Sequence, residues 1–452
     1  MSAIRLIQMS SPSGPAELDA LLSVLRGGGL LSADAKSKSG SELKSGSKPN
    51  LDVPAIVSDI LNQVRNGGDE AAARLTSSLD RADITPATLR VPAELIARAH
   101  AAAEPEFLAL MRRAIENIRA YQEHILIKAP PPLERGGRKL GVRYTPIERA
   151  AVYVPGGQAL YPSTVLMTVV PAQVAGVAEI VMVSPPTDGE INSMALALAG
   201  ELGISEVYRL GGAVAVAAMA YGTESIPAVH KIVGPGNAFV AEAKRQLFGT
   251  VGIDSIAGPS EVVIVADDTA RADWVAADLL AQAEHDPGSA VLITQSAALA
   301  TEVEKCLEAQ LSDLERADVI RPALESYCAI VLTRDLSSAC ELANRFAPEH
   351  LQLMTQDDAR CAEAIQHAGA IFSGGNTPVP LGDYFAGPSH VLPTGGTARF
   401  FGPLSSNDFI KATSLLEYDE ASVAQDAEDV ADFATREGLT AHARAARKRL
   451  PE

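Results

Sequence analysis

The sequence predicts an α/β fold: two doubly wound, incomplete Rossmann-like parallel-sheet domains, with small helical segments at the N- and C-termini. Short apolar runs that end in Gly or Pro alternate with longer stretches of helical period. This alternation occurs twice in 452 residues, a length that suits two or three domains of roughly 100–200 residues each. Two successive α/β units are therefore the simplest interpretation.

The N-terminal part of the chain is predicted to be helical. Residues 1–48 are expected to form a helical tail and a flexible loop, because Ser, Lys and Gly dominate residues 36–48. From residue 53 to about residue 120 the apolar side chains recur with the period of a helix, beginning with Ile56, Ile60 and Leu61.

The predicted strands are short runs rich in Val, Ile and Leu. They cover residues 150–154, 180–183 and 207–210 in the first repeat, and residues 262–265, 291–293, 330–332 and 351–353 in the second. We expect residues 49–152 and 266–397 to form one discontinuous α/β domain, and residues 153–265 to form the other. Residues 398–452 are expected to be a helical segment, whose basic end suits a helix C-terminus.

The charge and the cysteines exclude several classes of function. A net charge of −18 makes nucleic acid an unexpected partner and disfavours anionic membrane surfaces. There is no signal peptide and no run of about 18 apolar residues, so we expect a cytoplasmic protein that does not contact membranes. The four cysteines have the spacing of neither a zinc knuckle nor a disulfide framework.

Glu349 and His350 are the strongest candidates for acid/base chemistry. They follow Pro348, where a helical pattern stops. Histidine titrates near neutral pH, and a neighbouring carboxylate can hold a proton or activate water. The alternative for either side chain alone is a surface charge or a satisfied polar group in the core.

A second set of side chains has the chemistry of a metal site. Gln282 and His285 are three residues apart on a helical stretch, so both are expected on one face. Asp383, in a Gly-containing turn, and His442 would complete a set of donors for a catalytic divalent metal. Alternatively, Gln282 is an ordinary polar residue that caps a helix face and His442 is a solvated side chain. The spacing of these residues alone does not distinguish the two interpretations. A metalloprotease is disfavoured, since the HExxH motif is absent.

A glycine-containing turn, Gly234-Pro235-Gly236-Asn237, follows a predicted strand and precedes a helix. Such a turn lets the backbone approach a phosphate group at a helix N-terminus. Phe239 stands where the third glycine of the dinucleotide fingerprint would be, so a simple tight turn is an equal alternative. A phosphate-binding loop of the nucleotide-triphosphatase type is absent.

Seven motifs, in order along residues 53–449, resemble the histidinol dehydrogenase family. They are Tyr153-Val154-Pro155-Gly156-Gly157, Gly234-Pro235-Gly236-Asn237-Ala238-Phe239-Val240, Ala257-Gly258-Pro259-Ser260-Glu261, Gln282-Ala283-Glu284-His285, Ala347-Pro348-Glu349-His350-Leu351, His390-Val391-Leu392-Pro393-Thr394 and Glu437-Gly438-Leu439-Thr440-Ala441-His442. The resemblance implies oxidation of L-histidinol through L-histidinal to L-histidine, the last steps of histidine biosynthesis, with reduction of two NAD⁺. It also implies that residues 153–265 bind NAD.

The resemblance also implies roles for individual residues. Glu349 and His350 would be the catalytic acid/base pair. One Zn²⁺ per subunit would be held by Gln282, His285, Asp383 and His442. The substrate would contact Ser260, Gln282, His285, His350, Asp383, Glu437 and His442, and NAD would lie along Tyr153 and Asn237. The family forms intertwined homodimers, in which the C-terminal segment with Glu437 and His442 completes the partner's site.

The chain departs from the family pattern at two positions near these motifs. Val214 stands where a cofactor-binding Gln is common, and Ser389 stands where Asn is frequent. Val214 favours the alternative function, a paralogous NAD-dependent dehydrogenase for another amino or primary alcohol. The presence of Glu437 and His442, which suit an imidazole-bearing amino alcohol, argues against that alternative.

Overall fold

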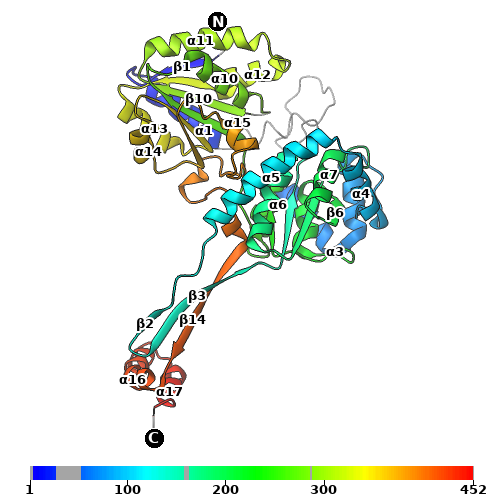
Figure 1. Ribbon diagram of the computed structural model, residues 1–452, viewed down its shortest axis with the longest axis vertical. Helices are drawn as coiled ribbons and strands as arrows, with labels where there is room; N and C mark the ends of the chain where they lie inside the picture. The colour runs from blue at the N-terminus through cyan, green and yellow to red at the C-terminus, as the bar shows by residue number, and fades with distance from the viewer. Residues whose placement is uncertain (1–3, 27–51, 157–161, 286–287, 451–452) are drawn as a thin grey trace.

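The computed structural model describes residues 4–26, 52–156, 162–285 and 288–450, and consists of two α/β units and a long arm (Figure 1). Each unit is built on a parallel sheet, as predicted. The arm projects away from both units and carries the C-terminal helices at its far end. The predicted loop at residues 36–48 lies outside the described residues.

The first unit contains a five-stranded parallel sheet. Its strands, in spatial order, are β6 (Glu206–Arg209), β5 (Glu179–Ser184), β4 (Arg149–Tyr153), β7 (Lys231–Val233) and β8 (Gly252–Ile253). One face is covered by α3 (Val53–Asp80), α8 (Gly212–Tyr221) and α9 (Ala238–Leu247). The other face is covered by α4 (Ala93–Ala102), α5 (Pro105–Ile125), α6 (Pro162–Ala175) and α7 (Ser193–Glu201).

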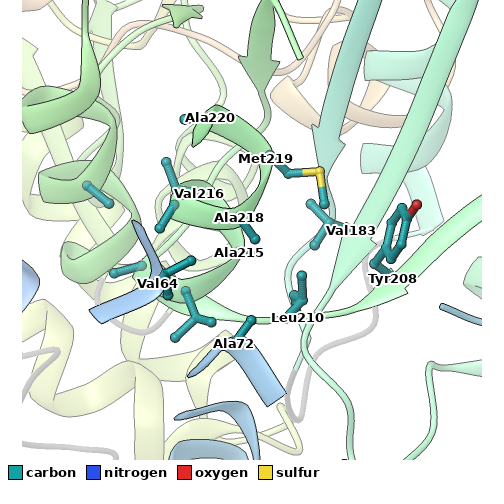
Figure 2. Packing of buried hydrophobic residues seen from close by; sticks show 14 of the residues in the cluster. Val64, Ala72, Val183, Tyr208, Leu210, Ala215, Val216, Ala218, Met219 and Ala220 are labelled. Atoms are coloured by element: carbon teal, nitrogen blue, oxygen red, sulfur yellow. The ribbon is translucent and has the colours of Figure 1, made fainter. Parts of the chain in front are cut away.

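Small aliphatic side chains fill the core of this unit, because aromatic residues are scarce. Figure 2 shows Ala215 and Ala218 of α8 beside Val64 of α3, with Val183 of the sheet nearby. The alanines let the two helices and the sheet approach closely, so methyl groups replace larger rings in the packing. Tyr208, at the edge strand β6, is one of the few aromatic rings buried in this unit.

The second unit contains a six-stranded parallel sheet. Its spatial order is β1 (Arg5–Gln8), β11 (Ala329–Leu332), β10 (Gly288–Thr294), β9 (Ser260–Ala266), β12 (His350–Met354) and β13 (Ala370–Ser373). On one face lie α1 (Gly14–Arg26), α13 (Leu336–Phe346) and α14 (Asp358–Ala364). On the other lie α10 (Ala272–Ala283), α11 (Ala297–Leu311), α12 (Ala317–Tyr327) and α15 (Val379–Tyr384).

The arm is an antiparallel ribbon. Its strands are β14 (Ile410–Tyr418), β3 (Arg138–Pro146) and β2 (Leu133–Arg135), and its tip carries α16 (Glu420–Arg436) and α17 (Thr440–Arg447). Three short 3₁₀ helices complete the described elements: η1 (Pro86–Thr88), η2 (Thr397–Arg399) and η3 (Ser406–Phe409). No helix within the described ranges is long and apolar enough to cross a bilayer.

The predicted domain boundaries were wrong in two respects. The helices of residues 53–125 cover the sheet formed by β4 to β8, so these helices and β4 belong with residues 153–253 rather than with residues 266–397, and β2 and β3 belong to the arm. The boundary at residue 265 cuts through β9, which lies at the centre of the second sheet. Apolar period identifies a helix but not the sheet on which its apolar face packs, which explains the error.

The terminal segments were predicted to be helical, but each also contains a strand. Residues 5–8 form the edge strand β1, which buries only Ile7 fully, so the sequence lacks the apolar run of a central strand. In the C-terminal segment, β14 is a nine-residue strand of which no residue is fully buried. Most of its side chains are exposed, because no sheet or helix layer among the described residues covers the length of the ribbon.

Candidate active site

Glu349 and His350, the candidate acid/base pair, lie at the amino end of the second sheet. Helix α13 ends at Phe346, and Ala347 adopts a left-handed conformation with a φ of 51°, which turns the chain toward β12. His350 is the first residue of β12, and Ser260 is the first residue of the neighbouring strand β9. The two parallel strands therefore begin side by side with their polar residues at one edge.

Glu349 is buried and held by two hydrogen bonds. The hydroxyl of Ser260 donates to Glu349 Oε2 at 2.7 Å, and the backbone N–H of Glu261 donates to the same oxygen at 2.8 Å. Burial raises the pKa of Glu349, against the opposing effect of His350. A carboxyl group with a raised pKa can exchange protons near neutral pH.

His350 is also buried, and its two ring nitrogens have different surroundings. Nδ1 lies 3.0 Å from the carbonyl oxygen of Glu261, a group that accepts only, so Nδ1 carries a proton. Nε2 faces Asp383 Oδ1 at 3.4 Å. Burial disfavours a charge on His350, but the carboxylates of Glu349 and Asp383 outweigh it and raise its pKa to about 9.

Asp383 lies among three histidines. Burial disfavours its charge, but His350, His390 and His285 together lower its pKa. His390 Nδ1 is 2.9 Å from the carbonyl oxygen of Asp383, and burial lowers the pKa of His390. Burial likewise lowers the pKa of His285, which keeps that imidazole neutral, the form that binds a metal. Asp383 lies in the short helix α15 rather than in the predicted turn.

Gln282 and His285 do not share one helix face, because α10 ends at Ala283. The N–H of His285 donates to the carbonyl oxygen of Gln282 at 3.2 Å in the turn that follows. Gly288 fixes this turn, since a Cβ there would lie 2.1 Å from the Gln282 carbonyl oxygen and 3.1 Å from His285 Cβ. The two side chains are therefore positioned by a tight turn before β10.

The described residues of one chain contain no group of three His, Cys, Asp or Glu side chains arranged to hold a metal ion. The donors present nevertheless suit a divalent transition metal. Gln282 is buried, and its Nε2 has no hydrogen-bond partner among the residues that the structure describes. His285 and His350 Nε2 lie near Asp383, and imidazole and carboxylate donors suit zinc. Exchange of the amide atoms of Gln282 would present an oxygen donor.

Glu437 and His442 lie far from this group within the chain. Glu437 follows α16, His442 lies in α17, and both side chains are exposed at the tip of the arm (Figure 1). The structure of a single chain therefore does not bring them to the residues around His350.

The residues assigned to NAD lie at the carboxyl edge of the first sheet. Tyr153 ends β4, is buried, and accepts a hydrogen bond from the N–H of Gly212 at 3.1 Å. Asn237 follows β7 and caps helix α9 by accepting from the N–H groups of Phe239 and Val240 at 3.0 and 3.2 Å. Val214 is buried in the apolar core of α8.

Three functional residues were not identified from the sequence. Glu261 contacts both members of the acid/base pair, although it is simply the residue after Ser260 in a quoted motif. Lys244 and Asp254 hydrogen-bond to the carbonyl oxygen and the N–H of Gly234, respectively, in the turn before Asn237. For Glu261 and Lys244 the available signal was a charged residue inside an apolar strand or helix, whereas Asp254 follows strand β8 and had no such signal.

A buried Glu–His pair in one α/β unit, with a glycine-containing turn at the sheet edge of the other, is compatible with an oxidoreductase of the dehydrogenase class. The chain belongs to the histidinol dehydrogenase family, because the family model described as histidinol dehydrogenase matches residues 44–450. It is 54% identical to histidinol dehydrogenase of Rhodopirellula baltica over 390 residues, covering 86% of this chain and 85% of that protein.

Two further comparisons agree with this assignment. Histidinol dehydrogenase of Geobacillus kaustophilus is 49% identical over 396 residues, covering 87% of this chain and 93% of that protein. The crystal structure of histidinol dehydrogenase from Elizabethkingia anophelis matches with a TM-score of 0.88 at 30% identity, covering 99% of this chain and 98% of that one. The predicted family, fold class and class of enzyme are confirmed.

Proposed function

We propose that the protein oxidises L-histidinol through L-histidinal to L-histidine and reduces two NAD⁺ in doing so. Membership of the histidinol dehydrogenase family supports the substrate. The observation that supports the proposed chemistry is the buried pair Glu349 and His350, two proton carriers that lie side by side. Nδ1 of His350 is already hydrogen-bonded to the carbonyl oxygen of Glu261. Nε2 of His350 is thus the atom that exchanges a proton with the substrate.

The roles of the two residues follow from their surroundings. In its neutral form, with Nε2 unprotonated, His350 takes the hydroxyl proton as hydride leaves the alcohol carbon for NAD⁺, which gives the aldehyde. Glu349, with a raised pKa, takes a proton from the water that adds to the aldehyde. His350 then takes a proton from the resulting hydrate as a second hydride leaves for another NAD⁺. Removing one such base costs about 10²–10⁴-fold in rate.

A zinc ion fits this site, and we propose Gln282, His285 and Asp383 of one chain and His442 of a second chain as its ligands. Zinc would supply a positive centre that orients the substrate next to the acid/base pair. Ser260 and Glu437 would add polar contacts to the substrate, and Tyr153 and Asn237 would hold NAD. The amide NH₂ of Asn237 donates no hydrogen bond among the described residues, so it can serve a ligand.

We propose a homodimer in which each arm reaches the other subunit. The arm exposes large apolar side chains that a folded chain normally covers, with Leu416 70% and Phe433 67% exposed. Glu437 and His442 lie on the same arm, so one docking event would cover these side chains and supply the missing ligand. Four free cysteines suit a reducing compartment, and we place the protein in the cytoplasm.

The test is an assay of NADH formation with L-histidinol on metal-replete protein. Two NADH for each histidinol, loss of activity with a chelator and recovery with zinc are expected. The competing candidate is a dehydrogenase for another amino or primary alcohol, which Val214 favours because no cofactor-binding Gln stands there. Faster turnover of another primary alcohol than of histidinol would establish that candidate instead.

A further inference from the structure

Glu261 touches the acid/base pair with three of its groups. Its backbone N–H donates to Glu349 Oε2 at 2.8 Å, and its carbonyl oxygen accepts from His350 Nδ1 at 3.0 Å. Its side-chain Oε1 accepts from the backbone N–H of Glu349 at 3.3 Å. One residue of β9 thus fixes the carboxylate of Glu349, the backbone of Glu349 and the ring of His350.

The same side chain connects the pair to a loop from another part of the chain. Oε1 of Glu261 also accepts from the N–H of Gly395 at 3.0 Å, in a turn with left-handed glycines at 395 and 396. Residues 393–396 and 349–350 are thereby held to one carboxyl oxygen. Because both hydrogen bonds end on that oxygen, the Glu261 side chain links the two segments through a single acceptor atom.

We propose that Glu261 is a positioning residue, whose side-chain oxygen keeps Glu349 and His350 aligned for proton transfer. The inference rests on the proposed roles of Glu349 and His350. Without that oxygen, the N–H of Glu349 and the N–H of Gly395 lose their acceptor, and the start of β12 can shift. A displacement of about 1 Å at reacting groups can cost roughly 10²-fold in rate.

The chain offers a matched control on the same two strands. Asp267 follows the other end of β9, is buried, and accepts from the N–H of Gln356, just beyond β12, at 2.8 Å. Asp267 therefore ties β9 to β12 as Glu261 does, but at the end away from the acid/base pair. A purely structural role would make the two carboxylates equivalent in their effect on kcat.

The experiment compares E261L, E261Q and E261D with D267L, using kcat, the KM for histidinol and for NAD⁺, zinc content and Tm. E261Q keeps an acceptor oxygen and is expected to retain kcat within about threefold, whereas E261L is expected to lose about 10²-fold. Both KM values and the zinc content should stay close to wild type in E261L. D267L should lower Tm and leave kcat unchanged. E261D, one methylene shorter, should fall between E261Q and E261L.

Two results would overturn the inference. E261Q as slow as E261L would mean that the negative charge matters and the acceptor oxygen does not. Equal kcat in folded E261L and D267L would mean that Glu261 has a structural role only. If E261L does not fold, a wild-type kcat in E261D would refute the positioning role of Glu261. H350N separates the two proposals: an active H350N refutes the assigned acid/base pair, whereas an inactive H350N beside a fully active E261L refutes only the role of Glu261.

Discussion

Lys244 and Asp254 form a buried ion pair that encloses the backbone of Gly234. Lys244 Nζ lies 2.6 Å from Asp254 Oδ1 and donates to the carbonyl oxygen of Gly234 at 2.6 Å. The other carboxyl oxygen of Asp254 accepts from the N–H of Gly234 at 2.7 Å. Gly234 itself has a φ of 113° and leaves no space for a Cβ beside the Tyr153 carbonyl oxygen. The ion pair thus fixes the turn that leads to Asn237.

We expect K244M to destabilise the protein and to weaken the binding of NAD⁺. Removing one partner of a buried ion pair leaves an uncompensated charge and costs about 3–5 kcal/mol. The carbonyl oxygen of Gly234 would then lose its hydrogen bond from Lys244, and Asp254, which holds the N–H of Gly234, would lose its charged partner. NAD⁺ binding measured by calorimetry should therefore weaken more than histidinol binding. K231M is a suitable control, because Lys231 is a partly buried lysine of strand β7 in the same unit, and it contacts Asp408 rather than Asp254. Equal NAD⁺ affinity in K244M and K231M would contradict the expectation.

G288A should disrupt the turn that carries two of the proposed zinc ligands. The added methyl group would lie 2.1 Å from the carbonyl oxygen of Gln282, a backbone atom that moves only with the turn. Zinc content, measured by metal analysis after dialysis, should fall together with activity. G402A is a control for a glycine-to-alanine change away from this turn, because the space beside Gly402 is open and its backbone is not left-handed. Full zinc occupancy in G288A would show that the turn does not hold the metal.

H350N and E349Q should each lose catalysis while the protein remains folded. A base of this kind contributes about 10²–10⁴-fold to the rate, and both residues are expected to act on groups already bound. His350 serves both oxidations, so H350N should slow the reactions of histidinol and histidinal alike. E349Q should slow the oxidation of added histidinal more than that of histidinol, since Glu349 acts on the water. Stopped-flow measurement of each half-reaction checks both statements.

Seven strands were predictable because most of their residues are buried and the sequence there contains a short apolar run. Strands β4, β5, β6, β9, β10, β11 and β12 were all located in this way. The ribbon strand β14 and the edge strand β1 were missed, since an exposed strand has no continuous apolar run. The sequence pattern also could not assign helix α3 to a sheet, because an apolar helix face does not indicate which sheet it covers.

The site was predictable where the side chain itself does the chemistry. Glu349, His350, Ser260 and Asp383 were named from the sequence, and the structure brings them into one region. Glu261 was missed because it acts through backbone atoms and one shared oxygen, which residue type does not reveal. The distance between His442 and this region also could not be predicted, because the order of residues in a sequence does not show whether they meet within one chain or between two chains.

Complementation between two inactive chains tests the proposed exchange of arms. H285A alters the body of the site and H442A alters the arm, so each homodimer should have no intact zinc site. In a mixed dimer of the two variants, one site combines the unaltered body of one chain with the unaltered arm of the other. Random mixing should therefore restore about a quarter of the sites of the wild type. The two variants are co-expressed with different affinity tags, and the doubly tagged dimer is assayed for zinc and NADH formation. A mixed dimer as inactive as its parents would mean that each arm serves its own chain or none.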